Sequence, residues 1–349
     1  MNSGILSKYG TQFLQVALTL TVALVMGALV MELSGKDSVE AYKVLLVSAL
    51  GSRIAIANTL LAATPLIFSG LGAAIAFRAG VFNVGVEGSI YMGAFASAWV
   101  GFTFLGLPAL PLILLSVLAA IIAGGLWCYF PGVLKARLNV DEIVTTIMLN
   151  YVAILFTSYL VNYPFRLPGL SNAMSAEVAP QAWLARLVPP SQFNASFIVA
   201  VICAFFMAFL FNRMRLGFEL RTVGDNTVFA RWSGMPVMRV IEKVMFISGL
   251  LGGLAGAAQV LGVNYRFIAN FSPGYGFTGI TIALLARNSP IGTLIGALLF
   301  GILRSGSSSM EIFTDVPRDL ITVLEATVIF FAALEFSFTW LRRKRHATT

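Results

Sequence analysis

Residues 217–234 read GFELRTVGDNTVFARWSG, a polar, arginine-containing stretch between two long apolar runs. The flanking runs, residues 196–211 and 240–263, are long enough or nearly so to cross a bilayer as helices. Arg and Lys near the ends of a span resist translocation, which favours the cytoplasmic side. We therefore predict two membrane-spanning helices joined by a cytoplasmic loop, residues 213–239, that a soluble partner can touch.

The composition is that of a polytopic membrane protein. Of the 349 residues, 58% are hydrophobic and 11% charged, whereas soluble domains have about 45–50% apolar and about 25% charged residues. The net charge of +8 comes from basic residues that stand beside hydrophobic spans. This placement indicates membrane topology rather than nucleic-acid binding, so no nucleic-acid partner is expected.

Along the whole chain the apolar runs predict an all-α protein with about ten transmembrane helices, some of them broken or re-entrant. A mixed-charge loop is expected at 32–53, an external loop at 164–195 with a short interfacial helix near 181–187, and an external turn at 264–276. The two runs at 277–286 and 291–303 are short for a bilayer. The predicted spans are residues 11–31, 54–77, 89–105, 107–133, 143–163, 196–211, 240–263, 277–286, 291–303 and 320–341.

Orientation follows from the basic residues. Alternating the spans from a cytoplasmic N-terminus places most of the 23 Lys and Arg residues inside, as the positive-inside rule requires. Both termini are therefore expected in the cytoplasm. Residues 1–349 are expected to form a single transmembrane domain.

Residues 77–88, FRAGVFNVGVEG, are too polar and glycine-rich for lipid contact. We interpret them as a broken or re-entrant start of the next span, presenting Asn83 and Glu87. Irregular backbone at membrane depth is tolerated where it lines a water-filled cavity or is buried in protein. Two interpretations stay open: these side chains line a pathway, or they satisfy backbone groups at a helix junction. Two interpretations also stay open for Asn150, which lies within a span: it contacts substrate, or it makes an interhelical hydrogen bond.

The span at 240–263 carries two rows of small residues at every fourth position. This spacing lets membrane helices approach closely and predicts tight packing without chemistry. The rows are Ser248, Gly252 and Gly256, and Gly249, Gly253 and Ala257.

Catalytic signatures are missing from the sequence. It has no phosphate-binding loop and no cluster of metal ligands, and its one histidine, His346, lies in the C-terminal tail. The two cysteines, Cys128 and Cys203, stand apart in apolar runs, which is typical of packing residues. We expect no metal, no cofactor and no enzyme activity.

Three motifs together resemble the permeases of ABC importers. They are RAGVFNVGVEG at 78–88, DEIVTTIMLNY at 141–151, and LRTVGDN at 220–226 followed by AR at 230–231 and SG at 233–234. The chain is most similar to the nucleoside-uptake branch of the ribose and branched-chain amino-acid permease superfamily, over about residues 50–335. It departs from the family pattern at 227–229 and at Trp232, which is expected to affect which ATPase the loop fits.

The resemblance implies that residues 219–234 form a coupling helix seated in a groove of a separate cytosolic ABC ATPase. Asp225 or Asn226 is expected to cap this helix, with Arg221 and Arg231 projecting. The coupling residues implied are Glu219, Arg221, Gly224, Asp225, Asn226, Arg231 and Gly234. The candidates for the substrate pathway are Asn83, Glu87 and Asn150.

The implied function is the membrane subunit of an importer in a bacterial cytoplasmic (inner) membrane. Its expected partners are the ATPase, a second permease subunit in a homo- or heterodimer, an extracytoplasmic substrate-binding protein and membrane lipid. A nucleoside is the favoured solute, with a sugar or another small solute as the alternative. A self-sufficient secondary transporter or channel stays open as a different class, with Glu87, Glu325 and Glu335 as its ion-coupling acids.

Overall fold

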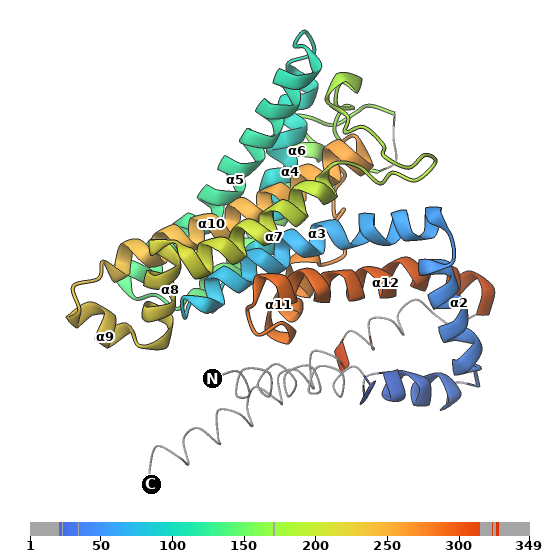
Figure 1. Ribbon diagram of the computed structural model, residues 1–349. Helices are drawn as coiled ribbons and strands as arrows, with labels where there is room; N and C mark the ends of the chain where they lie inside the picture. The colour runs from blue at the N-terminus through green and yellow to red at the C-terminus, as the bar shows by residue number, and fades with distance from the viewer. Residues whose placement is uncertain are drawn as a thin grey trace. The chain divides into compact units, whose positions relative to one another are not determined.

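The computed structural model describes residues 21–22, 24–33, 35–169, 172–314, 323 and 326–327. All regular elements in these residues are helices, apart from two isolated bridges, Met174 to Ile268 and Arg186 to Asn194. The principal helices, labelled in Figure 1, are α2 Ser38–Leu50, α3 Arg53–Arg78, α4 Val86–Thr103, α5 Ala109–Leu138, α6 Glu142–Asn162, α7 Ser196–Arg213, α8 Arg215–Asp225, α9 Thr227–Trp232, α10 Val237–Gln259, α11 Tyr275–Leu285 and α12 Pro290–Thr314.

The chain divides into two compact units. The larger comprises Leu60–Gly301, and the smaller comprises Met1–Thr59 with Ile302–Thr349. Both boundaries fall inside helices, α3 and α12. The candidate functional residues described below all lie in the larger unit.

Six helices in the described part of the chain are long and apolar enough to cross a membrane. Their bounds confirm the predicted spans in these regions to within a few residues, except at the C-terminal end of α5 and in α12. The six are Arg53–Arg78, Ala109–Leu138, Glu142–Asn162, Ser196–Arg213, Val237–Asn264 and Pro290–Thr314. The predicted spans 11–31, in large part, and 320–341, with Glu325 and Glu335, lie outside the described residues.

Four local predictions are wrong. The expected loop at 32–53 contains helix α2, which starts because Asp37 Oδ1 accepts hydrogen bonds from the amides of Val39 (2.9 Å) and Glu40 (3.0 Å). The short span at 291–303 is part of the longer α12, in which the Ser307 hydroxyl bonds to the carbonyl of Arg304 within the helix (2.7 Å). The span at 107–133 continues to Leu138. The interfacial helix near 181–187 is only a 3₁₀ turn, Pro180–Ala182.

Helix α10 forms the centre of the larger unit and packs against α4 and α5. Its two rows of small residues face different neighbours, as the every-fourth spacing permits. A Cβ atom added at Gly253 would overlap the carbonyl oxygen of Ala120 in α5, and one added at Gly256 would overlap that of Ile90 in α4. Helix α5 also has buried residues at every fourth position: Leu112, Ser116, Ala120, Gly124, Cys128 and Gly132.

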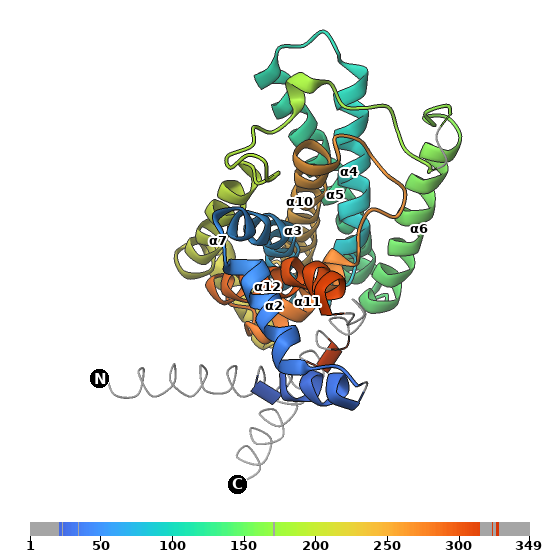
Figure 2. The same cartoon turned by 90° about the vertical axis from the view of Figure 1, so that its right-hand side faces the viewer.

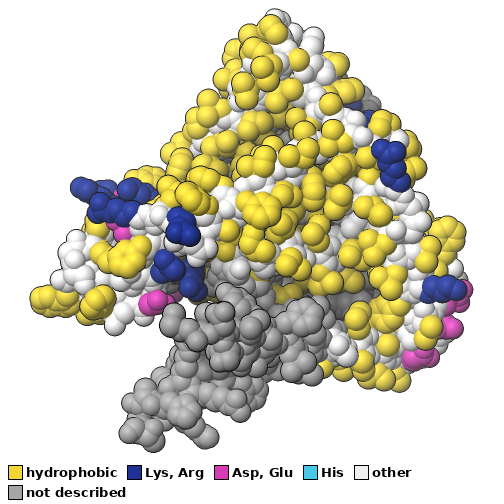
Figure 3. Space-filling model, in the orientation of Figure 1, with side chains coloured by type: hydrophobic (Ala, Val, Ile, Leu, Met, Phe, Trp, Pro, Cys, Tyr) yellow, Lys and Arg dark blue, Asp and Glu magenta, His cyan; other side chains and the backbone are white. Residues whose placement is uncertain are grey.

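Helices α5 and α6 expose most of their apolar side chains, whereas α3 and α10 bury theirs. In an 18-residue apolar stretch of each helix, 83% of the α10 residues and 78% of the α3 residues are buried, but only 28% of the α5 residues and 22% of the α6 residues. Figure 3 shows hydrophobic side chains covering the flanks of the long helices. Apolar faces of this extent are expected on a protein surrounded by lipid or by other membrane subunits.

Candidate functional site: coupling surface and polar junction

The arginine-containing stretch forms two short helices rather than one. The predicted single helix over 219–234 is wrong, because Asn226 adopts an extended conformation (φ −156°, ψ 99°) between α8 and α9. The Asn226 Oδ1 atom accepts a hydrogen bond from the Phe229 amide (2.9 Å), so Asn226 caps the start of α9. Asp225 is the last residue of α8, and its side chain has no capping role at α9.

The charged side chains of this stretch differ in their surroundings. Glu219 is buried and pairs with Arg215 one turn earlier (2.7 Å). The Arg221 Nε atom donates to the carbonyl of Gly217 in the same helix (3.1 Å), so Arg221 lies along α8 instead of projecting freely. Arg231 is exposed in the last turn of α9, and Gly234 (φ +76°) ends that helix.

The outer surface of α8 and α9 carries four large apolar side chains that are mostly exposed: Phe218 (56%), Val228 (66%), Phe229 (60%) and Trp232 (86%). Exposed arginines surround them in sequence, namely Arg213, Arg215, Arg231 and Arg239. Figure 3 shows basic side chains gathered near this end of the unit. We name these four apolar residues and four arginines the coupling surface. The sequence predicted the charged residues of this surface. Its only sign of the aromatic residues was the departure from the family pattern at 227–229 and Trp232.

The inner side of α8 packs on the larger unit. Leu220 and Val223 are almost fully buried. A Cβ atom added at Gly224 would overlap the carbonyl oxygen of Arg78, at the end of α3, and one at Gly217 would overlap that of Leu210, in α7. The stretch is therefore a structured element fixed to the ends of two helices.

The segment between α3 and α4, residues 79–85, forms a buried polar junction. Asn83 has no exposed surface, and its Oδ1 atom accepts from the Gly85 amide (2.8 Å). Its Nδ2 atom donates to the Ser248 hydroxyl in α10 (2.8 Å) and lies 3.3 Å from the Cys128 sulfur in α5. The Ser248 hydroxyl in turn donates to the carbonyl of Gly72 in α3 (2.6 Å). These bonds tie three helices to the junction.

Asn150 of α6 joins the junction from the other side. Its Oδ1 atom accepts from the Gly88 amide (2.8 Å), and its Nδ2 atom donates to the Val84 carbonyl (3.0 Å). The contacts of Asn83 and Asn150 are therefore those of the helix-junction interpretation. Their role in a substrate pathway stays a prediction.

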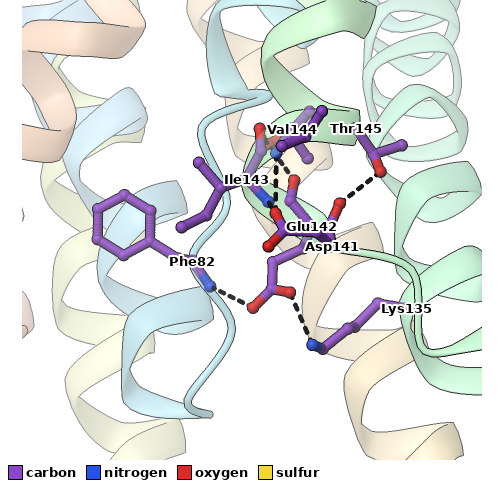
Figure 4. A network of polar contacts seen from close by, with 8 residues as sticks. Phe82, Lys135, Asp141, Glu142, Ile143, Val144 and Thr145 are labelled. Atoms are coloured by element: carbon purple, nitrogen blue, oxygen red, sulfur yellow. Dashed lines mark hydrogen bonds and ion pairs between the residues drawn. The ribbon is translucent and has the colours of Figure 1, made fainter.

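The second motif, residues 141–151, packs onto the first. Figure 4 shows Asp141 at the start of α6, where its Oδ1 atom accepts from the amides of Ile143 (2.9 Å) and Val144 (3.0 Å). The neighbouring Glu142 pairs with Lys135 of α5 (2.8 Å) and also accepts a long bond from the Phe82 amide (3.5 Å). Two motifs that are separate in sequence thus form one packed structure.

Glu87 lies where two helices start. It stands in the first turn of α4, is 2% exposed, and accepts a hydrogen bond from the amide of Gly276 in the first turn of α11. The N-terminal ends of helices carry partial positive charge, which stabilises a carboxylate between them. Glu87 thereby connects α4 to α11 in the interior of the larger unit.

An irregular segment, residues 265–274, connects the π-helical turn Val260–Asn264, which continues α10, to α11 and follows α4 on the way. Phe267 contacts Phe95 (ring centroids 5.6 Å apart), and Phe271 contacts Tyr91 four residues earlier in α4 (5.0 Å). Figure 2 shows this segment, in orange, descending beside α4. The predicted turn at 264–276 matches this segment to within two residues, but aromatic contacts with Tyr91 and Phe95 hold it against α4 before α11 starts beside Glu87. Its external position stays a prediction.

Known proteins resemble this chain over nearly its whole length. The family model "Branched-chain amino acid transport system / permease component" matches residues 55–334. The guanosine ABC transporter permease protein NupP of Bacillus subtilis is 36% identical over 94% of both chains. The glucose ABC transporter permease protein TsgB13 of Haloferax volcanii is 37% identical over 93% of this chain and 86% of its own. The nucleoside ABC transporter permease protein NupB of Lactococcus lactis is 34% identical over 89% and 88%.

Two of these organisms have a second, more distant permease of the same description. These are NupQ of Bacillus subtilis and NupC of Lactococcus lactis, each 29% identical to this chain.

The family match and the extended resemblance agree with the structure, in which six helices of the described residues are long and apolar enough to cross a membrane. Permease components of ABC transporters are transport subunits without catalytic activity of their own, and they associate with an ABC ATPase and a substrate-binding protein. The alternative of a self-sufficient secondary transporter has no support from these relatives. The chain therefore belongs to the branched-chain amino acid transport permease family and is a multi-pass membrane permease component of an ABC transporter.

Proposed function

We propose that the chain forms the import pathway for a nucleoside across a bacterial cytoplasmic membrane. The observation that carries this proposal is the similarity to NupP and NupB over nearly the full length of each chain. A sugar is the second candidate, because TsgB13, a glucose permease protein, is 37% identical.

The proposed topology has ten spans, with both termini in the cytoplasm and residues 1–349 in one permease domain. The six candidate spans of the described residues support this arrangement, as does the concentration of Lys and Arg on the side assigned to the cytoplasm. In this orientation, loop 213–239 is cytoplasmic and loop 164–195 is external.

We propose that the coupling surface docks the cytosolic ATPase. Interfaces between proteins typically have an apolar, often aromatic centre and a polar rim. The exposed side chains of Phe218, Val228, Phe229 and Trp232 supply such a centre, and the arginines supply a basic rim. Of the coupling residues implied by the sequence, Arg231, Asp225 and Gly234 lie on or beside this surface. Glu219, Arg221 and Asn226 stabilise its two helices, and Gly224 contacts the end of α3.

The second permease subunit is proposed to be a different chain, giving a heterodimer. NupP and NupQ come from one organism, as do NupB and NupC, and this chain is closer to one member of each pair. A partner similar to NupQ or NupC is therefore expected. The exposed apolar faces of α5, α6 and α7 are available for this subunit and for lipid.

Solute identity is tested with the purified transporter, reconstituted in liposomes with its second permease, ATPase and binding protein. We expect ATP-dependent uptake of radiolabelled guanosine that excess unlabelled nucleoside blocks and excess glucose does not. Uptake of glucose alone would replace the nucleoside assignment by the sugar one. Uptake by this chain without any ATPase would contradict the proposed function.

The coupling surface is tested by ATPase retention on the immobilised permease complex. We expect the Phe229→Ala, Trp232→Ala double variant to lose at least about tenfold in affinity, because aromatic side chains at interface centres often contribute 2 kcal/mol or more. Phe205→Ala is the matched control, since Phe205 is equally exposed (60%) but lies in the apolar span of α7. Equal retention by both variants would exclude this surface as the docking site.

A further inference from the structure

The contact between α8 and the turn after α3 is made by backbone on both sides. A Cβ atom added at Gly224 would overlap the Arg78 carbonyl oxygen and lie 3.0 Å from the carbonyl carbon of Ala79. From the other side, a Cβ added at Gly80 would lie 3.2 Å from the Cα atom of Gly224. Gly80 has φ +75°, a left-handed conformation that glycine adopts without strain. No flexible side chain lies between the two segments, so they cannot move independently without losing the contact.

The turn at Gly80 is connected in the other direction to the polar junction. Asn83, three residues later, is fixed to α10 through Ser248 (2.8 Å). The next residues are fixed to α6, because Asn150 bonds to the Val84 carbonyl (3.0 Å) and the Gly88 amide (2.8 Å). A displacement of the turn must therefore disturb these bonds or move the junction as a body.

The junction leads directly into the first turn of α4. There Glu87 accepts the hydrogen bond from Gly276, which belongs to the first turn of α11. The packing here is also close, since a Cβ added at Gly276 would lie 2.5 Å from the Glu87 amide nitrogen. A continuous series of backbone contacts and buried hydrogen bonds thus runs from α8 to the start of α11.

We propose that the Gly224–Gly80 contact transmits movement of α8 to the polar junction and, through it, to the N-terminal ends of α4 and α11. This inference rests on the proposed role of the coupling surface in docking the ATPase. It assigns Gly224, which is exposed on one side and touches the end of α3 on the other, the role of a positioning residue. Closely packed elements deform little and can carry coupling between sites.

The test is Gly224→Ala, which adds one methyl group at the contact and leaves the covalent links of α8 to α7 and, through α9, to α10 intact. The control is Gly106→Ala, in the turn after α4, because no heavy atom lies within 4 Å of a Cβ added there. Both variants are reconstituted in liposomes with the second permease, ATPase and binding protein. The measurements are ATPase retention, ATP hydrolysis, and solute imported per ATP hydrolysed, with a radiolabelled nucleoside as the probe.

For Gly224→Ala we expect wild-type ATPase retention and continued hydrolysis, with import per ATP reduced at least about tenfold, within the usual range for coupled sites. Gly106→Ala should match the wild type in all three measurements. An unchanged import-to-ATP ratio in Gly224→Ala would overturn the inference. Loss of ATPase retention by this variant would also overturn the inference, because Gly224 would then belong to the docking face. In that case the proposed function would stand. Failure of the wild type to retain any ATPase would overturn both.

A second variant covers the case in which Gly224→Ala does not assemble. Ser248→Ala removes the hydroxyl that binds the Asn83 amide and the Gly72 carbonyl, at a distance from the coupling surface. The inference predicts the same result: ATPase retained and import per ATP reduced. If Ser248→Ala imports as much solute per ATP as the wild type, the inferred transmission through the junction is wrong.

Discussion

At the scale of single residues, the polar side chains inside this permease act mainly on backbone groups of other segments. Asn150 illustrates this, since its amide bonds to Val84 and Gly88, which lie more than 60 positions earlier in the chain. A lone asparagine in an apolar span indicates a hydrogen bond, but its partner depends on which segments fold against each other. Sequence could therefore single out Asn83 and Asn150 as buried polar groups without choosing between the junction and the pathway.

We predict that Asn150→Ala lowers the stability of the permease by about 1–3 kcal/mol, because it leaves a buried amide and a buried carbonyl without their partners. The measurement is the midpoint of thermal unfolding in detergent. Asn212→Ala is the control, since the Asn212 side chain is exposed and bonds only to its own helix (Ala208 carbonyl, 2.9 Å). Equal midpoints for the two variants would contradict the structural role of Asn150.

At the scale of helices and loops, hydrophobic runs located most of the described spans, because span length is set by the bilayer and by composition. The errors occurred where local hydrogen bonds decide. Asp37 starts α2 in a stretch with mixed charges, and Asn226 divides the coupling segment into two helices. The course of residues 265–274 along α4 was also missed, since it depends on contacts of Phe267 and Phe271 with a distant helix.

The cap of α9 gives a second prediction. Asn226→Ala removes the acceptor for the Phe229 amide, which costs about 1 kcal/mol of helix stability. We expect the affinity for the ATPase to fall about fivefold, because the variant must regain this lost helix stability when α9 is held as a helix in the complex. Asn226→Ser keeps an acceptor and should recover most of the affinity. If the Ala and Ser variants bind the ATPase equally, the cap has no part in docking.

At the scale of the whole molecule, the proposed orientation predicts which loops each side of the membrane can reach. In a background with Cys128 and Cys203 replaced by serine, Asn172→Cys lies in the loop assigned to the outside and Thr227→Cys starts α9. An impermeant maleimide should label Asn172→Cys in intact spheroplasts and Thr227→Cys only after permeabilisation. The reverse pattern would invert the topology and remove the coupling surface from the reach of a cytosolic ATPase.

The two rows of small residues in α10 also restrict how this protein can have diverged from its relatives. At Gly253 and Gly256 the opposing wall is main chain, which every amino-acid replacement in α4 or α5 leaves in place. A larger residue at either position therefore has no compensating substitution elsewhere, unlike a clash between two side chains. We expect these positions to be nearly invariant in an alignment of permeases for different solutes. Inherited changes in specificity would then accumulate on helix faces turned away from α10, while the central three-helix packing stays fixed.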